Sequence, residues 1–401
     1  MLSPGAPARD LGYQPALDGV RALAIIGVLL LHLSLWGAVP RVTPGGHLGV
    51  AVFFVLSGYL ITRLLMDEHV RSGRVDMSAF YARRAARLLP ALLLLLVVHT
   101  LVWGTQRPSW TIALQIAVGL CYLTSLVHPV IFDVGGLSWT WSLSVEEHFY
   151  LFWPAVLRRA LAEPRGRTIA MWCCGGMIAV AVTLRALLND SATWHDFVYY
   201  STPARMDALA VGCLAALATH GRRLTVPVPL AWAAFGLLVV SYFVPALGQG
   251  TRVMNLLGLP LLSVATVVLI LGLVGRPDRG PARLLSARPL VHIGKISYGL
   301  YLWNLLAGQS MRMVFGESRT GWLGTVLGLA LTLVAVELSY WCLERPVLRW
   351  TRHRLAARRQ PAHRVVIPRQ PGVERRTPQP AVTPATIGAG QYEPTPVGGR
   401  R

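Results

Sequence analysis

Long apolar stretches recur along most of this chain, from residue 21 to residue 343. The core of a bilayer is about 30 Å thick, so a helix of about 20 apolar residues crosses it. Hydrophobic residues make up 54 % of the chain and charged residues 14 %, whereas a soluble domain carries about 25 % charged residues. The pattern predicts an all-α fold, a polytopic bundle of transmembrane helices.

The basic connectors predict about ten spans, because they should all fall on one side of the membrane. Residues 111–127 and 141–157 are both apolar enough to cross. If both crossed, the basic segment 158–167 would face outside and every later basic connector would be inverted. We therefore predict that 111–127 is re-entrant or forms a surface helix, and that both termini are cytoplasmic. The spans are expected at about 18–36, 48–66, 88–104, 141–157, 169–188, 204–220, 228–245, 252–274, 292–312 and 320–343.

Composition divides the chain into three parts. We expect 1–15 to be a cytoplasmic leader, 16–346 a membrane domain, and 347–401 a basic, proline-rich, disordered cytoplasmic tail. The net charge of +20 agrees with a positive-inside bias and attraction to anionic lipid, and no nucleic-acid-binding module is recognisable. The five cysteines lie in apolar runs without metal-type spacing, so neither a metal site nor a disulfide framework is expected.

The first apolar run, LDGVRALAIIGVLLLH, places an arginine and a histidine on one helix face. Arg21 and His32 are separated by three turns plus about 20°, and by roughly 16 Å along the axis. Ionisable groups at membrane depth are costly, so each needs a partner or a function. His32 is either a hydrogen-bonded structural residue or a general base facing a cavity, and Arg21 on the same face favours the base.

Two adjacent carboxylates, Glu146 and Glu147, lie where a helix is expected to begin in WTWSLSVEEHFY. Ser142 or Ser144 could cap this helix, with a glutamate completing a capping box, which explains one of the two carboxylates. The alternative is that the carboxylates orient an imidazole or neutralise an imidazolium. We predict that this imidazole is His32.

Three arginines follow one another closely in FYARRAARLLP. Arg84 and Arg87 are three residues apart and share a helix face, and Arg83 adds a third positive charge. These arginines either anchor the helix at the cytoplasmic surface or bind a phosphorylated ligand, because guanidinium groups match the geometry of phosphate.

Polar residues also occur inside later spans. Arg205 and Asp207 are two residues apart and do not share a helix face, so each is expected to meet a partner on another helix. Tyr301 and Asn304 are i, i+3 neighbours, so a polar stripe could face the same cavity. The residues that we predict to contact a substrate are Ser142, Arg205, Asp207 and Tyr301.

These stretches together resemble the acyltransferase 3 family of integral membrane acyltransferases. The matching pieces run from residue 13 to about 346 and are YQPALDGVRALAIIGVLLLH, GVAVFFVLSGYLIT, FYARRAARLLP, WTWSLSVEEHFYLFWP, ARMDALAVG, ISYGLYLW and CLERP. The resemblance implies a transferase that takes an acyl group, often acetyl, from cytoplasmic acyl-CoA. It implies that the group goes to a hydroxyl of a sugar, a glycan or a secondary metabolite.

The resemblance also implies roles for individual residues. It places the catalytic arginine and histidine of the family on Arg21 and His32. It places the two connector arginines, which we expect to bind the donor, on Arg84 and Arg87. The glutamate motif, also expected to be catalytic, falls on Glu146 and Glu147.

The chain departs from the family pattern in two places. Similar sequences often have a histidine where this chain has Asn304, so no catalytic imidazole is assigned there. Nothing after residue 346 resembles the extracytoplasmic hydrolase-like domain of some members, so direct transfer to the acceptor is expected. The compact architecture is similar to that of members acting on macrolides and of small O-antigen modifiers.

The prediction is therefore an O-acyltransferase with His32 as general base, embedded in the bilayer. Acyl-CoA would be a donor substrate, and no permanently bound cofactor is expected. A covalent acyl-histidine intermediate is an alternative to direct transfer. The rival function is a transporter or flippase for a glycolipid or metabolite, which would use the same intramembrane charges as a translocation path.

Overall fold

The computed structural model describes residues 12–35, 43–104, 107–128, 131–132, 134–191, 193–222, 224–304, 308 and 321–359. This part of the chain is helical throughout and contains no strand, as the sequence predicts. Residues 1–357 form one compact unit, and residues 358–401 form a second. Most of the expected tail lies outside the described residues. Residues 347–359 of it are described and belong to the helix Arg345–Arg359.

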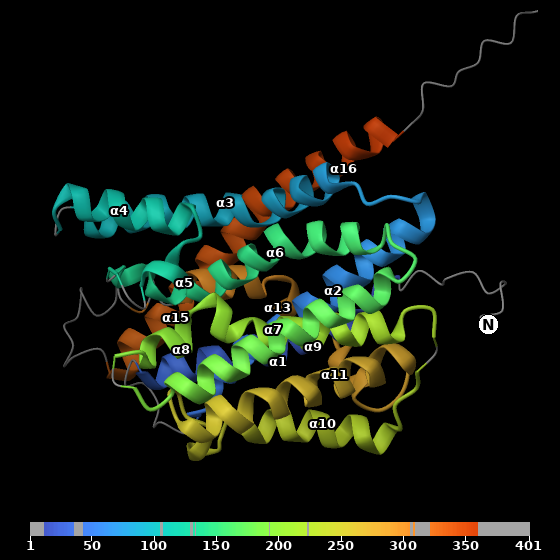
Figure 1. The fold of residues 1–401 in the computed structure, drawn as a ribbon. Helices are drawn as coiled ribbons and strands as arrows, with labels where there is room; N and C mark the ends of the chain where they lie inside the picture. Colours follow the sequence, from blue (N-terminus) through green and yellow to red (C-terminus); the bar gives the residue numbers. More distant parts are fainter. Residues whose placement is uncertain are drawn as a thin grey trace, which may run out of the picture. The chain divides into compact units, whose positions relative to one another are not determined.

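The helices follow one another in the order shown in Figure 1. Their bounds are α1 (Pro15–Leu35), α2 (Gly49–Ser72), α3 (Met77–Trp103), α4 (Ser109–Leu120), α5 (Thr124–Val127), α6 (Trp141–Ala160), α7 (Gly166–Leu188), α8 (His195–Tyr200), α9 (Thr202–Thr219), α10 (Val228–Ser241), α11 (Leu259–Gly275), α12 (Pro281–Leu285), α13 (Arg288–Lys295), α15 (Gly321–Ser339) and α16 (Arg345–Arg359). Short 3-10 turns are η1 (Gly46–Leu48), η2 (Gly135–Thr140) and η3 (Pro245–Leu247). Single π-turns, η4 (Met254–Gly258) and η5 (Tyr340–Glu344), precede α11 and α16.

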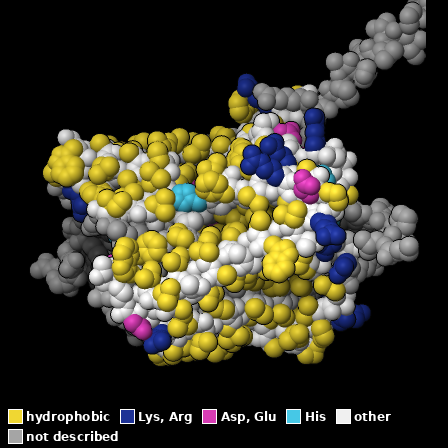
Figure 2. Space-filling model, in the orientation of Figure 1, with side chains coloured by type: hydrophobic (Ala, Val, Ile, Leu, Met, Phe, Trp, Pro, Cys, Tyr) yellow, Lys and Arg dark blue, Asp and Glu magenta, His cyan; other side chains and the backbone are white. Residues whose placement is uncertain are grey.

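Six of the described helical segments are long and apolar enough to cross a membrane, so the protein is a multi-pass membrane protein. They are 15–34, 46–72, 77–103, 166–188, 254–275 and 323–357. Large apolar side chains on the surface, such as Trp172 and Leu187, agree with contact with lipid. Figure 2 shows hydrophobic side chains over most of one face, with most of the basic side chains of that face toward its right side.

The expected count of about ten spans is not confirmed, since six segments of the described residues meet the requirements of length and composition. The segments expected at 141–157, 204–220, 228–245 and 292–312 contain helices that do not meet both requirements. α10 has 14 residues and is therefore about 21 Å long, less than the bilayer core. α13 ends at Lys295, and the chain turns at Ile296 before helical residues 297–304.

Residues 111–127 do not form one continuous helix. α4 ends at Leu120, and Tyr122 adopts a left-handed conformation with φ of 54° before α5 begins. With 12 residues, α4 is about 18 Å long and too short to cross the bilayer core by itself.

α2 lies against α9, and α9 also packs on α7 (Figure 1). The two backbones approach closely where Gly58 faces Gly212. A Cβ atom on Gly58 would lie 2.0 Å from the carbonyl oxygen of Leu209, and one on Gly212 would lie 2.1 Å from that of Val55. Small residues at such a crossing let the two backbones come this close. Helices in lipid gain no hydrophobic driving force for association, so close packing of this kind holds them together.

We predict that Gly58→Ala and Gly212→Ala each lower the free energy of unfolding by about 1–3 kcal/mol, because backbone must move to admit a methyl group. The thermal unfolding midpoint of the purified protein in detergent measures this loss. Gly175→Ala and Gly236→Ala on α7 and α10 are matched controls, since a Cβ there meets no atom within 4 Å. Equal midpoints for the two pairs would contradict the proposed packing.

Candidate functional site

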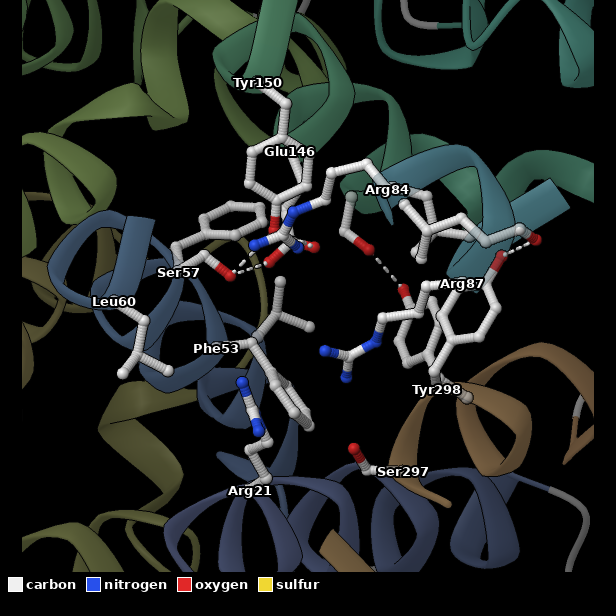
Figure 3. A pocket seen from close by; sticks show the side chains of 16 residues that line it. Arg21, Phe53, Ser57, Leu60, Arg84, Arg87, Glu146, Tyr150, Ser297 and Tyr298 are labelled. Atoms are coloured by element: carbon white, nitrogen blue, oxygen red, sulfur yellow. Dashed lines mark hydrogen bonds between the residues drawn. The ribbon is translucent and has the colours of Figure 1, made fainter. Parts of the chain in front are cut away.

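A cavity lies between α1, α2, α3, α6 and helical residues 297–304. Its wall includes six of the ten predicted site residues, although they are far apart in the sequence. They are Arg21, Arg84, Arg87, Ser142, Glu146 and Tyr301. Figure 3 shows the guanidinium groups of Arg21 and Arg87 pointing into this space from opposite sides. We call it the central cavity.

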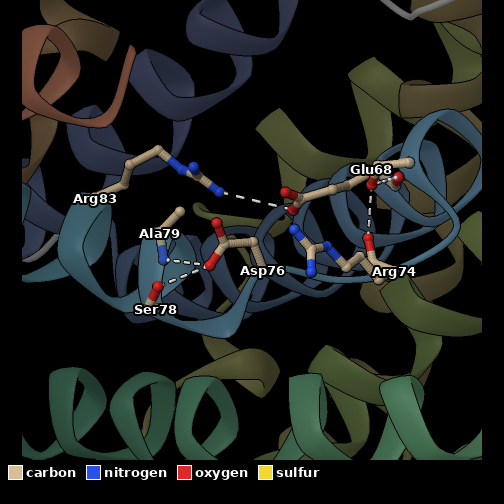
Figure 4. Close-up of polar contacts among 7 residues, drawn as sticks. Glu68, Arg74, Asp76, Ser78, Ala79 and Arg83 are labelled. Carbon is tan, nitrogen blue, oxygen red and sulfur yellow. Dashed lines mark hydrogen bonds and ion pairs between the residues drawn. The ribbon is translucent and has the colours of Figure 1, made fainter. Parts of the chain in front are cut away.

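The start of α3 determines where its arginines point. Asp76 caps the helix by accepting hydrogen bonds from the Ala79 amide at 2.9 Å and the Ser78 hydroxyl at 2.8 Å (Figure 4). Arg83 lies 3.8 Å from Glu68 of α2. Arg84 and Arg87 line the central cavity, so the prediction that these two share a face is confirmed.

Glu146 is held by two neutral donors. The Ser57 hydroxyl donates to Oε1 at 2.7 Å, and the Tyr150 hydroxyl lies 3.4 Å from Oε2 and 3.1 Å from the Ser57 hydroxyl. The Arg84 guanidinium lies over the Tyr150 ring, 4.3 Å from its centroid. The carboxylate therefore attracts the cavity arginines through space without a direct ion pair to either Arg84 or Arg87.

The central cavity has an excess of positive charge. Its ionisable lining comprises Arg21, Arg84, Arg87 and one carboxylate, Glu146, besides tyrosines. Arg21 pairs with Asp18 at 2.8 Å, one turn earlier on α1. Arg87 forms no hydrogen bond or ion pair with any residue that the structure describes. Such a cavity favours an anionic ligand, because buried charges need a partner.

His32 does not line the central cavity, and its partner is Asn304. The two side chains lie 2.6 Å apart, from Nδ1 to Oδ1. The amide nitrogen of Asn304 donates to the carbonyls of Leu300 and Tyr301, at 2.8 Å each. Asn304 therefore presents its oxygen, which requires that Nδ1 of His32 carries the proton and donates it. Nε2 then keeps a lone pair and can accept a proton.

The expected contact between His32 and the glutamates is not formed. Glu146 is bonded to Ser57 and Tyr150, and the amide of Asn304 takes the orienting position beside the imidazole. Glu147 is the next residue along α6 and points about 100° away from Glu146, outside the central cavity. Arg84 is the nearest cation that attracts it.

Tyr301 connects the central cavity to the histidine. Its hydroxyl accepts a hydrogen bond from Ser142 at 2.7 Å and donates one to the Trp139 carbonyl at 2.8 Å. Asn304 follows Tyr301 by three residues, about 4.5 Å along a helix. The Ser142 hydroxyl thus bonds to Tyr301 on another helix and does not cap α6. His32 is thus linked to the wall of the central cavity through Asn304, one turn after Tyr301.

Arg205 and Asp207 lie apart from the central cavity. Asp207 pairs with Arg185 of α7, which also donates to the Ala204 carbonyl at 2.6 Å. The Arg205 guanidinium lies over both the Trp141 ring and the Tyr199 ring, with centroid distances of 5.5 Å and 5.4 Å. Each therefore meets partners on other helices, as expected, but neither lines the cavity that holds the other predicted residues.

Sequence analysis missed three partners of the predicted residues. Ser57 and Tyr150 bond to Glu146, and Arg185 pairs with Asp207. Each was visible only as a polar residue in an apolar run, and that pattern does not name its partner. No group of three or more histidine, cysteine, aspartate or glutamate residues within the described ranges is placed to hold a metal ion.

We predict that Asp207 stabilises the fold rather than contacting a substrate. Asp207→Ala leaves Arg185 buried without its anion, which costs about 3–5 kcal/mol, and the thermal midpoint in detergent should fall accordingly. Asp190→Ala is the control, because the Asp190–Arg252 pair is exposed and worth little. An unchanged midpoint together with weaker acceptor binding would instead support the substrate-binding role first expected.

Comparison with known proteins identifies the family of this chain. The pattern of the family described as "Acyltransferase domain" matches residues 14–341. The O-acetyltransferase OatA of Staphylococcus aureus, from strain NCTC 8325 / PS 47 and from strain COL, is 29 % identical over 353 residues, which cover 84 % of this chain and 57 % of OatA. The chain thus spans a little over half the length of these relatives. No solved structure matches it. The chain belongs to the acyltransferase 3 family.

Proposed function

We propose that this protein is a membrane O-acyltransferase that moves an acyl group, most simply acetyl, from acyl-CoA to a hydroxyl group. The observation that carries the proposal is the central cavity, where three arginines face one carboxylate. His32 lies outside its lining, but its partner Asn304 is one helical turn from the wall residue Tyr301. Family membership and the printed name of OatA support the reaction class. The acceptor would be a sugar, a glycan or a macrolide-type metabolite.

The donor would occupy the central cavity with its phosphates at the arginines. Coenzyme A is a polyanion, and guanidinium groups bind phosphate oxygens through paired hydrogen bonds. Arg87 has no anionic partner among the described residues, and Arg84 contacts rings instead of a carboxylate. The pantetheine arm would extend from Arg21 toward Ser142 and Tyr301, so that the thioester comes near His32.

The reaction would then proceed by direct transfer. Nε2 of His32 accepts the proton of the acceptor hydroxyl while the hydroxyl oxygen attacks the thioester carbonyl carbon. The carbon–sulfur bond breaks, an ester forms, and the proton passes from His32 to the departing thiolate, which leaves as coenzyme A. Asn304 would keep the imidazole in the required tautomer. A covalent acyl-histidine is an alternative route to the same products.

The orientation of the protein in the membrane would follow from the cytoplasmic location of acyl-CoA. The proposed donor enters from the cytoplasm, so Arg84, Arg87 and the start of α1 would face the cytoplasmic side. Both termini would then be cytoplasmic in a cell-membrane protein. The basic residues near the α2–α3 connection support this orientation.

A transporter or flippase for a glycolipid or metabolite is the second candidate. The same buried charges could line a translocation path. The two functions differ in one measurable product, because only the transferase consumes acyl-CoA and releases free thiol. Membranes that contain the protein, its acceptor and labelled acetyl-CoA would decide between them.

We expect His32→Ala to lower the rate of thiol release from acetyl-CoA by about 10²- to 10⁴-fold, the usual contribution of a positioned general base. His195→Ala is a control, because His195 is an exposed histidine away from the central cavity. Expression and thermal midpoint must match for both variants. Wild-type turnover by His32→Ala would contradict the assigned role.

We expect Arg87→Ala to raise KM for acetyl-CoA about 10- to 100-fold, since a charged hydrogen-bond partner of the donor phosphate is lost. Arg83→Ala is the matched control on the same helix, because Arg83 lies beside Glu68 and does not line the central cavity. Steady-state thiol release gives both constants. Equal KM values for the two variants would show that Arg87 does not bind the donor.

A further inference from the structure

A second cavity adjoins the central cavity at the beginning of α1. Its wall is formed by Gly12, Tyr13, Gln14, Leu17, Asp18, Arg21 and Leu60. Arg21 and Leu60 also line the central cavity, so the two spaces share a wall. We call the second space the mouth cavity. Whatever binds at Arg21 can therefore extend into it.

Tyr13 presents an ordered aromatic ring at the mouth cavity. Its hydroxyl donates to Asp18 at 2.7 Å, and Asp18 pairs with Arg21. Partial burial raises the pKa of Tyr13 to about 12, and the hydrogen bond to Asp18 acts in the same direction, so the phenol remains a donor. Tyr13 nevertheless has 63 % of its surface exposed, although the hydrogen bond restricts its ring.

A cation lies beside this ring. Nζ of Lys295, the single lysine of the chain, is 5.4 Å from the ring centroid. A tyrosine ring with a cation over one face can accept a flat heterocycle on the other. The lysine adds a positive charge within reach of a phosphate on the same ligand. An exposed aromatic ring and an arginine thus line one small space, and a lysine lies beside the ring without lining that space.

We infer that Tyr13 stacks on the adenine ring of the acyl-CoA donor and that the mouth cavity is its nucleotide subsite. The inference rests on the proposed acyl-CoA donor. Along the chain the order is Tyr13, just before α1, then Arg21 and His32 on α1, which matches the order of adenine, phosphates and thioester along the donor. Because the thioester lies toward His32, the nucleotide end must lie on the opposite side of Arg21, where Tyr13 is.

The test compares two donors, acetyl-CoA and acetyl-4′-phosphopantetheine, which lacks the adenosine part. Tyr13→Ala should raise KM for acetyl-CoA about 5- to 30-fold, as expected for loss of base stacking, and leave kcat unchanged. KM for acetyl-4′-phosphopantetheine should not change. Tyr13→Phe should behave as wild type with both donors, because the ring remains.

Three other results would overturn the inference. If Tyr13→Ala raises both KM values equally, Tyr13 acts through Asp18 and Arg21 and does not touch adenine. If neither KM changes, the nucleotide lies elsewhere. A wild-type protein that releases thiol from neither donor would overturn the proposed function, and this inference with it. Tyr13→Leu, which keeps an apolar side chain at the surface, should repeat the result of Tyr13→Ala if folding is intact.

Discussion

The hydrogen bonds that hold Glu146 set the electrostatics of the whole polar interior. Ser57 and Tyr150 donate to its two oxygens, so the carboxylate is satisfied without a cation. If Glu146 paired directly with Arg84 or Arg87, that arginine would be occupied and the cavity would lose part of its positive charge. Neutral donors keep the glutamate in the cavity wall while the arginines stay available to a ligand. This is a positioning role that a count of charges alone would not reveal.

The position of Ser57 depends in turn on the crossing of α2 and α9. Gly58 meets the α9 backbone, and its neighbour Ser57 points about 100° away on the same helix, into the central cavity. The charged residues of the fold then divide into two classes. Arg185 and Asp207 compensate each other where the helices pack, whereas Arg84 and Arg87 face a cavity without an ion pair. The first class stabilises the bundle, and the second class is available for chemistry.

Helical periodicity predicted those parts of the site that lie on one helix. The spacing of Arg84 and Arg87 placed both in the central cavity, and the apolar pattern located the helices that carry Arg21 and Glu146. Contacts between helices could not be obtained in this way. Asn304 is 272 positions from His32, and nothing in the local pattern distinguishes it from the glutamates as an imidazole partner. The count of about ten spans is not confirmed among the described residues, because α6 carries polar residues and the helix breaks at Ile296, both of which burial inside protein can accommodate.

His32 has Asn304 as its partner where a glutamate was expected, and this has a consequence for the proposed reaction. A carboxylate beside Nδ1 stabilises an imidazolium by charge, as in hydrolase triads. A neutral amide fixes the same tautomer but contributes only a hydrogen bond, so a protonated His32 would gain less from its partner. On the proposed function, His32 should therefore pass its proton to the departing thiolate as the carbon–sulfur bond breaks, which favours direct transfer over a long-lived charged intermediate.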